Sequence, residues 1–203
     1  MNANYEYSIA TQQSLTDFQG RFLNLLWHKP AEARARGAPV KAGKSQIQAK
    51  AKIILAKAKD VSNPVAEALN LGPCMIVEPT DKHRTSNRPF EKLSAAIGHR
   101  KHTGHNCLSY HITWVAENGE IPRVEGGAEY SHRCHQKWCV NPKHGQWENG
   151  AANKRRNICA DGRSHFLLDN GGIRHLVKIC THQPECLSGT LVQDMDHPDI
   201  TKV

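Results

Sequence analysis

The stretch of sequence that decides the fold runs Ser131-His132-Arg133-Cys134-His135-Gln136-Lys137-Trp138-Cys139-Val140-Asn141-Pro142-Lys143-His144. Cys134 and Cys139 are five residues apart, and His144 follows after another five. Two thiolates and an imidazole in so short a loop are typical of tetrahedral zinc, which prefers sulfur and nitrogen ligands. The fourth ligand must come from elsewhere in the chain.

A second group of metal-type residues lies towards the C-terminus, as Cys180-Thr181-His182-Gln183-Pro184-Glu185-Cys186. It offers three ligands within seven residues, and Cys159 upstream offers a fourth. Neither group has the usual zinc-finger spacing, but two sulfur-rich groups in one chain favour metal over buried apolar cysteines. For the isolated Cys107 we expect a buried apolar cysteine instead.

The composition explains why metal would be needed. The 203-residue chain is 38% apolar and 6% aromatic, which predicts a modest core, and it has 7 Cys and 13 His. Mean hydropathy is −0.61. The longest aliphatic run is Ile53-Ile54-Leu55-Ala56, far short of the ~18 apolar residues of a membrane span. Because Met1–Gln13 has no signal-peptide pattern, we expect a reducing, intracellular compartment in which clustered cysteines bind metal.

Positive charge is concentrated near the N-terminus. The chain has 27 Lys and Arg against 19 Asp and Glu, a net charge of +8 that suits a polyanionic partner. Between His28 and Asp60, nine Lys and Arg stand against two acidic residues. We assign residues 1–65 to a basic extension with a short helix at Leu15–Trp27, a linker at Pro30–Lys44 and a helix at Ser45–Val61. The lysines of this last helix either contact phosphates or are only solvated.

The remaining residues, 66–203, are expected to form one domain of short elements. Apolar and polar residues alternate over Leu108–Trp114, which predicts a half-buried strand. Its polar face either meets solvent or contacts DNA, and it consists of Ser109, His111 and Thr113. The sequence further predicts a hairpin turn at Asn118-Gly119, a strand at Ala128–His132 and a short helix at Trp147–Ile158.

The motif continues beyond His144 with Trp147-Glu148 and with Asn153-Lys154-Arg155-Arg156-Asn157-Ile158-Cys159. The pattern Ser-His-x-Cys-His-x3-Cys-x-Asn-Pro-x-His, Trp-Glu and Asn-Lys-x-Arg-Asn-x-Cys resembles the His-Cys box homing endonucleases, which belong to the ββα-metal (His-Me finger) nucleases. The resemblance resumes at Cys180 and extends weakly back to about Cys74. It implies a loop-rich α+β fold with a small antiparallel sheet, held together by two structural zinc ions.

The resemblance also implies which residues hold the two zinc ions. The first set matches Cys134, Cys139 and His144, with Cys74 as the fourth ligand by its position and Cys107 as the competitor. The second set matches Cys159, Cys180, His182 and Cys186. The chain departs from the family pattern in two places. The insert between Cys159 and Cys180 is longer and holds His165 and His175, and Gly145 stands where an apolar residue is expected.

The chemistry that the resemblance implies is phosphodiester hydrolysis in duplex DNA. His132 matches the family's general base, and an imidazole with an ordinary pKa of ~6.5 can take a proton from water at neutral pH. Asn153 matches the metal-binding residue, whose amide oxygen suits one catalytic Mg²⁺ per site. The family also has an arginine near the scissile phosphate, for which Arg88 is the best match and Arg84 and Arg100 are alternatives.

We therefore interpret the sequence as a Mg²⁺-dependent, site-specific, intron-encoded endonuclease that breaks both strands of DNA. The resemblance implies a homodimer on a pseudopalindromic site, a nuclear location, and a dimerisation tail at Leu187–Val203. The alternatives are a zinc-dependent DNA-binding regulator without catalysis and a nuclease that only nicks. His132 together with Asn153 distinguishes an enzyme from a regulator, because a pure DNA-binding protein needs neither.

Overall fold

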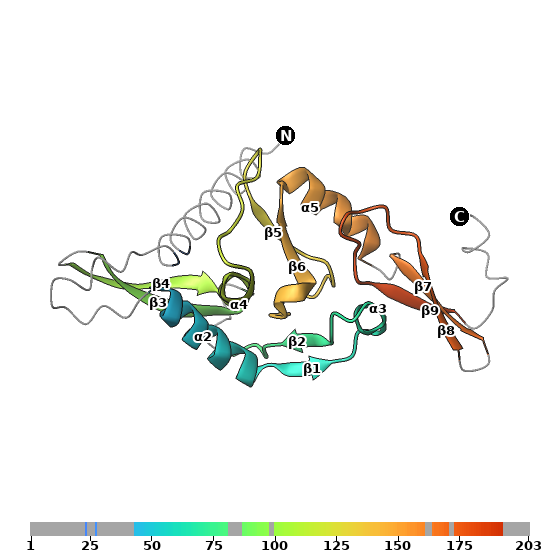
Figure 1. The fold of residues 1–203 in the computed structure, drawn as a ribbon, viewed down its shortest axis with the longest axis horizontal. Helices are drawn as coiled ribbons and strands as arrows, with labels where there is room; N and C mark the ends of the chain where they lie inside the picture. The colour runs from blue at the N-terminus through green and yellow to red at the C-terminus, as the bar shows by residue number, and fades with distance from the viewer. Residues whose placement is uncertain are drawn as a thin grey trace.

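The computed structural model of the chain describes Leu23, Trp27 and residues 43–80, 87–97, 100–160, 164–170 and 173–192. Small antiparallel sheets alternate with short helices and long loops (Figure 1), as expected for a loop-rich α+β fold. Of the predicted helix at Leu15–Trp27, only Leu23 and Trp27 belong to the described residues, and both are helical. Within the described parts, no helix is long and apolar enough to cross a membrane.

The main core lies between helices α2 (Gly43–Lys57) and α4 (Ser109–Asn118). Ile47, Ala51 and Ile54 form the buried stripe of α2, as their helical spacing predicts. The predicted helix at Ser45–Val61 is too long, because Lys59–Val61 forms β1, which pairs with β2 (Cys74–Ile76). The boundary at residue 65 stays a prediction, although α2 and β1 pack against elements that lie beyond it.

The predicted strand at Leu108–Trp114 is wrong, since these residues begin α4. The helix is covered on several sides, and its buried residues are Ser109, Tyr110, His111, Ile112, Thr113 and Val115. Alternation in a short, fully buried segment does not separate a strand from a helix. The three polar residues of the supposed solvent face therefore lie in the interior, and Thr113 Oγ1 donates to the Val140 carbonyl at 2.7 Å. Gly119 ends this helix with φ +91° instead of forming a hairpin turn.

A long two-stranded ribbon, which the sequence did not predict, precedes α4. It consists of β3 (Phe90–Ile97) and β4 (Arg100–Leu108), paired antiparallel with an irregularity between Leu93 and Ala95. Figure 1 shows this ribbon extending from one end of the molecule. Its base joins the core, where Leu93 and Cys107 are fully buried.

The centre of the molecule is a hairpin followed by a helix: β5 (Glu129–His132), β6 (Gly145–Glu148) and α5 (Gly150–Arg156). The predicted strand at Ala128–His132 is thus confirmed, whereas the predicted helix at Trp147–Ile158 begins later. It begins at Gly150 because the Asn149 side chain accepts a hydrogen bond from Ala152 N at 2.8 Å and caps it. A 3₁₀ turn, η3 (Pro142–His144), leads directly into β6, and a second one, η4 (Asn157–Cys159), follows α5.

A three-stranded sheet lies at the other end of the molecule from the ribbon (Figure 1). Its strands are β7 (His165–Asn170), β8 (Ile173–Lys178) and β9 (Gly189–Val192), in the order β8-β7-β9 with β9 parallel to β7. The first part of the predicted tail, residues 187–192, therefore packs within its own chain. Residues 193–203 lie outside the described residues.

The hairpin of β5 and β6 packs on α4 through aromatic rings. Tyr130 of β5 stacks on Tyr110 with ring centroids 4.9 Å apart and meets Trp147 edge-on at 5.4 Å. A Cβ atom at residue 145 would overlap the Tyr130 ring and hydroxyl. Gly145 thus replaces the expected apolar residue because Tyr130 fills its space.

We predict that Gly145→Ala destabilises the fold through this overlap. The expected loss is about 1–3 kcal/mol in the free energy of unfolding, which is typical of overpacking. Urea unfolding at a fixed excess of Zn²⁺ measures it. The double variant Tyr130→Ala/Gly145→Ala should lose less than the sum of the two single variants, because the overlapping ring is then absent. Strict additivity of the two losses would contradict this account.

Candidate functional site

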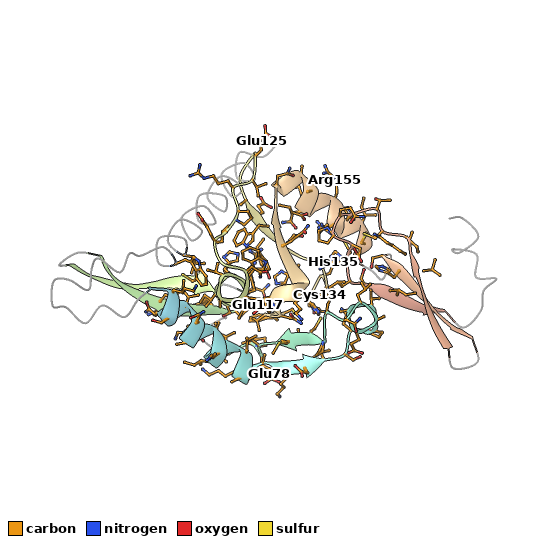
Figure 2. The ribbon with its side chains drawn as sticks, in the orientation of Figure 1. Glu78, Glu117, Glu125, Cys134, His135 and Arg155 are labelled. Atoms are coloured by element: carbon orange, nitrogen blue, oxygen red, sulfur yellow. The ribbon has the colours of Figure 1, made fainter. Side chains whose placement is uncertain are left out.

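The first group of metal-type residues assembles around the loop between β5 and β6. Strand β2 brings in the fourth ligand: Met75 O accepts from Val140 N at 2.8 Å, and Ile76 bridges to Cys139. The four ligand atoms lie within 4.8 Å of one another, and they belong to Cys74, Cys134, Cys139 and His144. Figure 2 shows Cys134 in the middle of the molecule.

The contacts around this group prepare it for a cation. Gly72 O lies 3.0 Å from His144 Nε2 and can only accept, so Nε2 carries the proton and Nδ1 faces the sulfurs. His144 Nδ1 lies 3.5 Å from Cys74 Sγ and 3.6 Å from Cys139 Sγ. Hydrogen bonds with Cys134 and Cys139 lower the pKa of the Cys74 thiol, so at least one sulfur of the group favours the thiolate.

The second group assembles in the loops after α5 and after β8, from Cys159, Cys180, His182 and Cys186. Cys159 Sγ and Cys180 Sγ are 3.7 Å apart. His182 Nδ1 lies 3.6 Å from Cys159 Sγ, 3.1 Å from Cys180 Sγ and 3.7 Å from Cys186 Sγ. Of the spare histidines in the long insert, His165 is buried elsewhere, against Ser164 Oγ at 3.0 Å, and for His175 only the backbone is described.

Both groups fit zinc. Tetrahedral bonds of ~2.3 Å to sulfur and ~2.1 Å to nitrogen imply S–S separations of about 3.8 Å and S–N separations of about 3.6 Å. The separations above, from 3.1 to 3.7 Å, agree with a shared central cation. Two Cys/His tetrads of this kind could therefore hold two zinc ions, in a chain whose core is small.

Cys107, the competitor for the fourth position of the first group, lies elsewhere in the fold. Cys107 is fully buried in the core around α4, and it belongs to neither ligand group. Burial raises the pKa of its thiol to about 12, so it stays protonated and apolar in character. Cys107 is therefore buried in the core, as expected, and Cys74 is the cysteine that lies beside Cys134, Cys139 and His144.

The two metal groups are joined by direct contacts. Arg133 Nε donates to the Glu185 carbonyl at 2.8 Å, and Leu187 N donates to the Arg133 carbonyl at 2.7 Å. Asn63 Nδ2 reaches the Leu187 carbonyl at 2.9 Å and Cys74 Sγ at 3.6 Å. The chain after Cys186 is therefore bound to the first metal loop.

A pocket of about 270 Å³ lies beside the first metal loop. It brings together three residues that the resemblance singled out, Arg88, His132 and Asn153, although they come from separate elements. The other residues that line it are Tyr110, Tyr130, Ser131, His135, Lys137, Lys154, Arg156 and Asn157. Arg84 lies outside the described residues, and for Arg100 only the backbone is described.

His132 is held in one orientation and one tautomer. Cys139 O lies 3.1 Å from its Nε2 and can only accept, so Nε2 carries the proton and Nδ1 keeps its lone pair. The ring edges of Tyr110 and Tyr130 pack against it at 4.5 and 5.1 Å between centroids. Burial lowers the pKa of His132 to about 4, which keeps the imidazole neutral at neutral pH.

Asn153 is oriented by a carboxylate. Its Nδ2 donates to Glu129 Oε2 at 3.0 Å, which leaves its amide oxygen free for a hard cation. Asn149 serves as the cap of α5, whereas Asn157 lines the pocket with Asn153.

Cationic side chains give the pocket its charge. Lys137 reaches Asn87 Oδ1 at 3.0 Å. Lys154 is exposed on α5, and so is Arg155, which Figure 2 labels. Arg156 is neither solvated nor free for a phosphate, because it is 2% exposed and pairs with Glu148 at 2.7 Å. The pocket can thus combine a neutral imidazole, an amide oxygen and several cations around a phosphodiester. Sequence reasoning missed Tyr110, Glu129 and Lys137, whose roles depend on contacts between distant segments.

We predict two zinc ions per chain, as measured by elemental analysis of the purified protein. Cys134→Ala and Cys180→Ala should each remove one zinc and destabilise the fold, since structural zinc contributes on the order of 10 kcal/mol in small domains. Cys107→Ala is the matched control, and it should keep both ions. A zinc content that falls in Cys107→Ala but not in Cys134→Ala would show that the ligand set is wrong.

Comparison with known proteins agrees with this geometry. A family model described as the zinc-binding loop region of homing endonucleases matches residues 73–197, which include both metal groups and the pocket helix. No curated protein and no solved structure matches the chain. The match covers more than half of the sequence, and both Cys/His tetrads fit a His-Cys box. The chain therefore belongs to the homing endonuclease family that carries this zinc-binding loop region.

Proposed function

We propose that this protein is a site-specific, intron-encoded homing endonuclease that hydrolyses phosphodiester bonds in duplex DNA. The observation that carries the proposal is the pocket in which Arg88, His132 and Asn153 meet beside the first metal loop. The family supports a nuclease-type role and DNA as the substrate. Cleavage at one specific site, dependence on Mg²⁺ and a nuclear location are part of the proposal.

In this mechanism His132 is the general base. Its Nδ1 lone pair takes a proton from a water molecule, and the water oxygen attacks the scissile phosphorus in line with the departing 3′-oxygen. The hydrogen bond from Nε2–H to the Cys139 carbonyl holds the ring in place, and it stabilises the positive charge that the imidazole gains. The product retains the 5′-phosphate, and the 3′-oxygen leaves as a hydroxyl after it gains a proton from solvent.

In the proposed mechanism, Asn153 and the cationic side chains of the pocket stabilise the negative charge of the scissile phosphate and its leaving group. The Asn153 amide oxygen would hold Mg²⁺, which when bound stabilises negative charge on the 3′-oxygen. The guanidinium of Arg88 hydrogen-bonds Tyr110, and from that position it can stabilise the equatorial phosphate oxygens. Lys137 and Lys154 line the same pocket and can contact the adjoining backbone phosphates.

DNA recognition is assigned to the ribbon β3–β4 in place of the buried residues Ser109, His111 and Thr113. A two-stranded ribbon fits the major groove. The ribbon projects from the body (Figure 1) and has a basic sequence that includes Lys92, Arg100, Lys101, His102 and His105. Lys52 and Lys57 are exposed on α2 and could contact backbone phosphates beside it.

The alternative, a DNA-binding regulator without catalysis, does not account for the pocket. Such a protein gains nothing from a histidine whose Nδ1 lone pair is preserved by a fixed tautomer, or from an asparagine held by a carboxylate. Both features suit proton transfer and cation binding. We therefore favour the enzyme.

Our prediction for catalysis uses His132→Ala. A supercoiled plasmid pool with random inserts is incubated with the zinc-loaded protein in Mg²⁺ or EDTA, and sequencing of the ends identifies the cleaved site. Wild type should cut a defined site only with Mg²⁺. His132→Ala should lose about 10²–10⁴-fold in rate, the usual contribution of a general base, with zinc content and DNA affinity unchanged. Asn153→Ala should also lose cleavage.

His135→Ala is the matched control, because His135 lines the same pocket from the same loop. It should retain more activity than His132→Ala. If His132→Ala cleaves at the wild-type rate, His132 is not the general base. Full binding without any cleavage by the wild type would favour the regulator.

We further propose that the active form is a homodimer. One chain holds one His132 and one Asn153, enough to cut one strand, and the two strands of duplex DNA are related by twofold axes. A symmetric dimer then meets a pseudopalindromic site. Because residues 187–192 pack within their own chain, dimer contacts of the tail would involve residues 193–203.

We predict that sedimentation of the full-length protein gives about twice the chain mass of 22.6 kDa. Truncation after Val192 keeps Leu187 and β9 in place, and it should shift the protein towards the monomer and towards nicking. A monomer that still breaks both strands at low concentration would contradict the dimer. A dimer that produces only nicked plasmid would support the nicking alternative.

A further inference from the structure

The carboxylate of Glu129 lies directly beside the pocket asparagine. Glu129 begins β5, and its Oε2 accepts a hydrogen bond from Asn153 Nδ2 at 3.0 Å. A carboxylate can only accept, so the amide nitrogen must face Glu129 and the amide oxygen must face the other way. Asn153 lines the pocket. The contact therefore decides which atom of the asparagine is offered to a cation.

The position of Glu129 is unfavourable unless it has a role of this kind. In the register of the hairpin, Glu129 lies opposite Glu148, and like charges in directly opposite positions destabilise a sheet. Glu148 is neutralised by Arg156, with contacts of 2.7 and 3.0 Å. Glu129 instead accepts a hydrogen bond from the neutral amide of Asn153, which lies three residues before Arg156 on α5. Its negative charge thus remains close to the proposed cation site.

The helix makes room for this carboxylate. A Cβ atom at Gly150 would lie 2.7 Å from Glu129 Oε1 and 3.1 Å from its Cδ. Glycine is a poor helix residue, and Asn149 already caps the helix, so glycine is not needed for the cap. The missing side chain at the first position of α5 is explained by the space that Glu129 occupies.

We propose that Glu129 is a positioning residue for the cation site of the proposed nuclease, acting by holding Asn153 with its amide oxygen towards the pocket and by adding negative charge beside it. This inference rests on the proposed function of Asn153. Outer partners of metal ligands typically change metal affinity by about 10–100-fold when they are removed. Glu129 does not itself line the pocket, so it would not contact the cation directly.

The first test compares cleavage by Glu129→Ala and Glu129→Gln over a range of Mg²⁺ concentrations, with the duplex identified from the plasmid pool. Glu129→Ala should raise the Mg²⁺ concentration for half-maximal cleavage by about 10–100-fold, and saturating Mg²⁺ should restore most of the rate. Glu129→Gln keeps an acceptor oxygen but loses the charge, so its shift should be smaller. Glu125→Ala is the matched control, since it removes an exposed charge from the preceding turn.

The second test moves Glu129 without changing it. In Gly150→Ala the new methyl group meets the flexible end of the Glu129 side chain, so the fold should persist while the carboxylate is displaced. Its Mg²⁺ dependence should shift in the same direction as that of Glu129→Ala. In the double variant Gly150→Ala/Glu129→Ala, the shift should be no larger than in Glu129→Ala alone.

The third test does not depend on cleavage. In zinc-loaded protein without Mg²⁺, the side-chain amide signal of Asn153 in ¹⁵N NMR spectra should move in Glu129→Ala and Gly150→Ala and stay in place in Glu125→Ala. Calorimetry of Mg²⁺ binding to the His132→Ala protein on the same duplex should show weaker binding when Glu129→Ala is added. An unmoved amide signal together with unchanged Mg²⁺ binding overturns the proposal. Wild-type protein whose Mg²⁺ binding depends on Asn153 and Glu129 but which does not cut DNA would overturn the proposed function alone.

Discussion

The four-residue ligand set of the first metal loop is the constraint on which the rest of the structure depends. Cys74 arrives on β2, from sixty residues before Cys134, and the loop between β5 and β6 supplies the other ligands. Metal bonds of this kind contribute folding free energy that a chain with 38% apolar residues cannot obtain from its core alone. The main core lies between α2 and α4. It is joined to the first metal loop by the hydrogen bond from Thr113 Oγ1 to the Val140 carbonyl. A cation held by these four residues would add to the strand pairing and the aromatic contacts that fix the hairpin on α4.

The proposed chemistry is built from the same loop. His132 lies two residues before one ligand, and its Nε2 is bound by the backbone carbonyl of another, Cys139. The bond that fixes its tautomer therefore exists only when the loop is folded around the metal group. A structural cation can in this way control a proton transfer in which it takes no part, because it determines where the backbone carbonyl points.

How much the sequence predicts depends on how local the signal is. Apart from Cys74, the metal-type residues lie with His132 and Asn153 in short runs that have a distinctive pattern. The structure assembles two Cys/His groups and places His132 and Asn153 in one pocket, as the resemblance implies. Helix α4 was mistaken for a strand because it is buried on several sides, so its polar residues do not mark a solvent face. The ribbon β3–β4 has few β-branched residues and gave no strand signal. The overlap of Tyr130 with the space at Gly145, and the contact of Glu129 with Asn153, join segments that no sequence period connects.

Helix α5 shows how a small fold can keep such a pocket in shape. Asn153 faces the pocket, and three residues later Arg156 pairs with Glu148 of the first metal hairpin. The same guanidinium donates to the Pro184 carbonyl at 2.8 Å and reaches Cys186 Sγ, a ligand of the second group, at 3.5 Å. Breaking a buried pair of this kind costs about 3–5 kcal/mol, so the helix is held firmly from both sides. The two metal groups thus act on one helix, and the second one, although distant from His132, helps to determine where Asn153 lies.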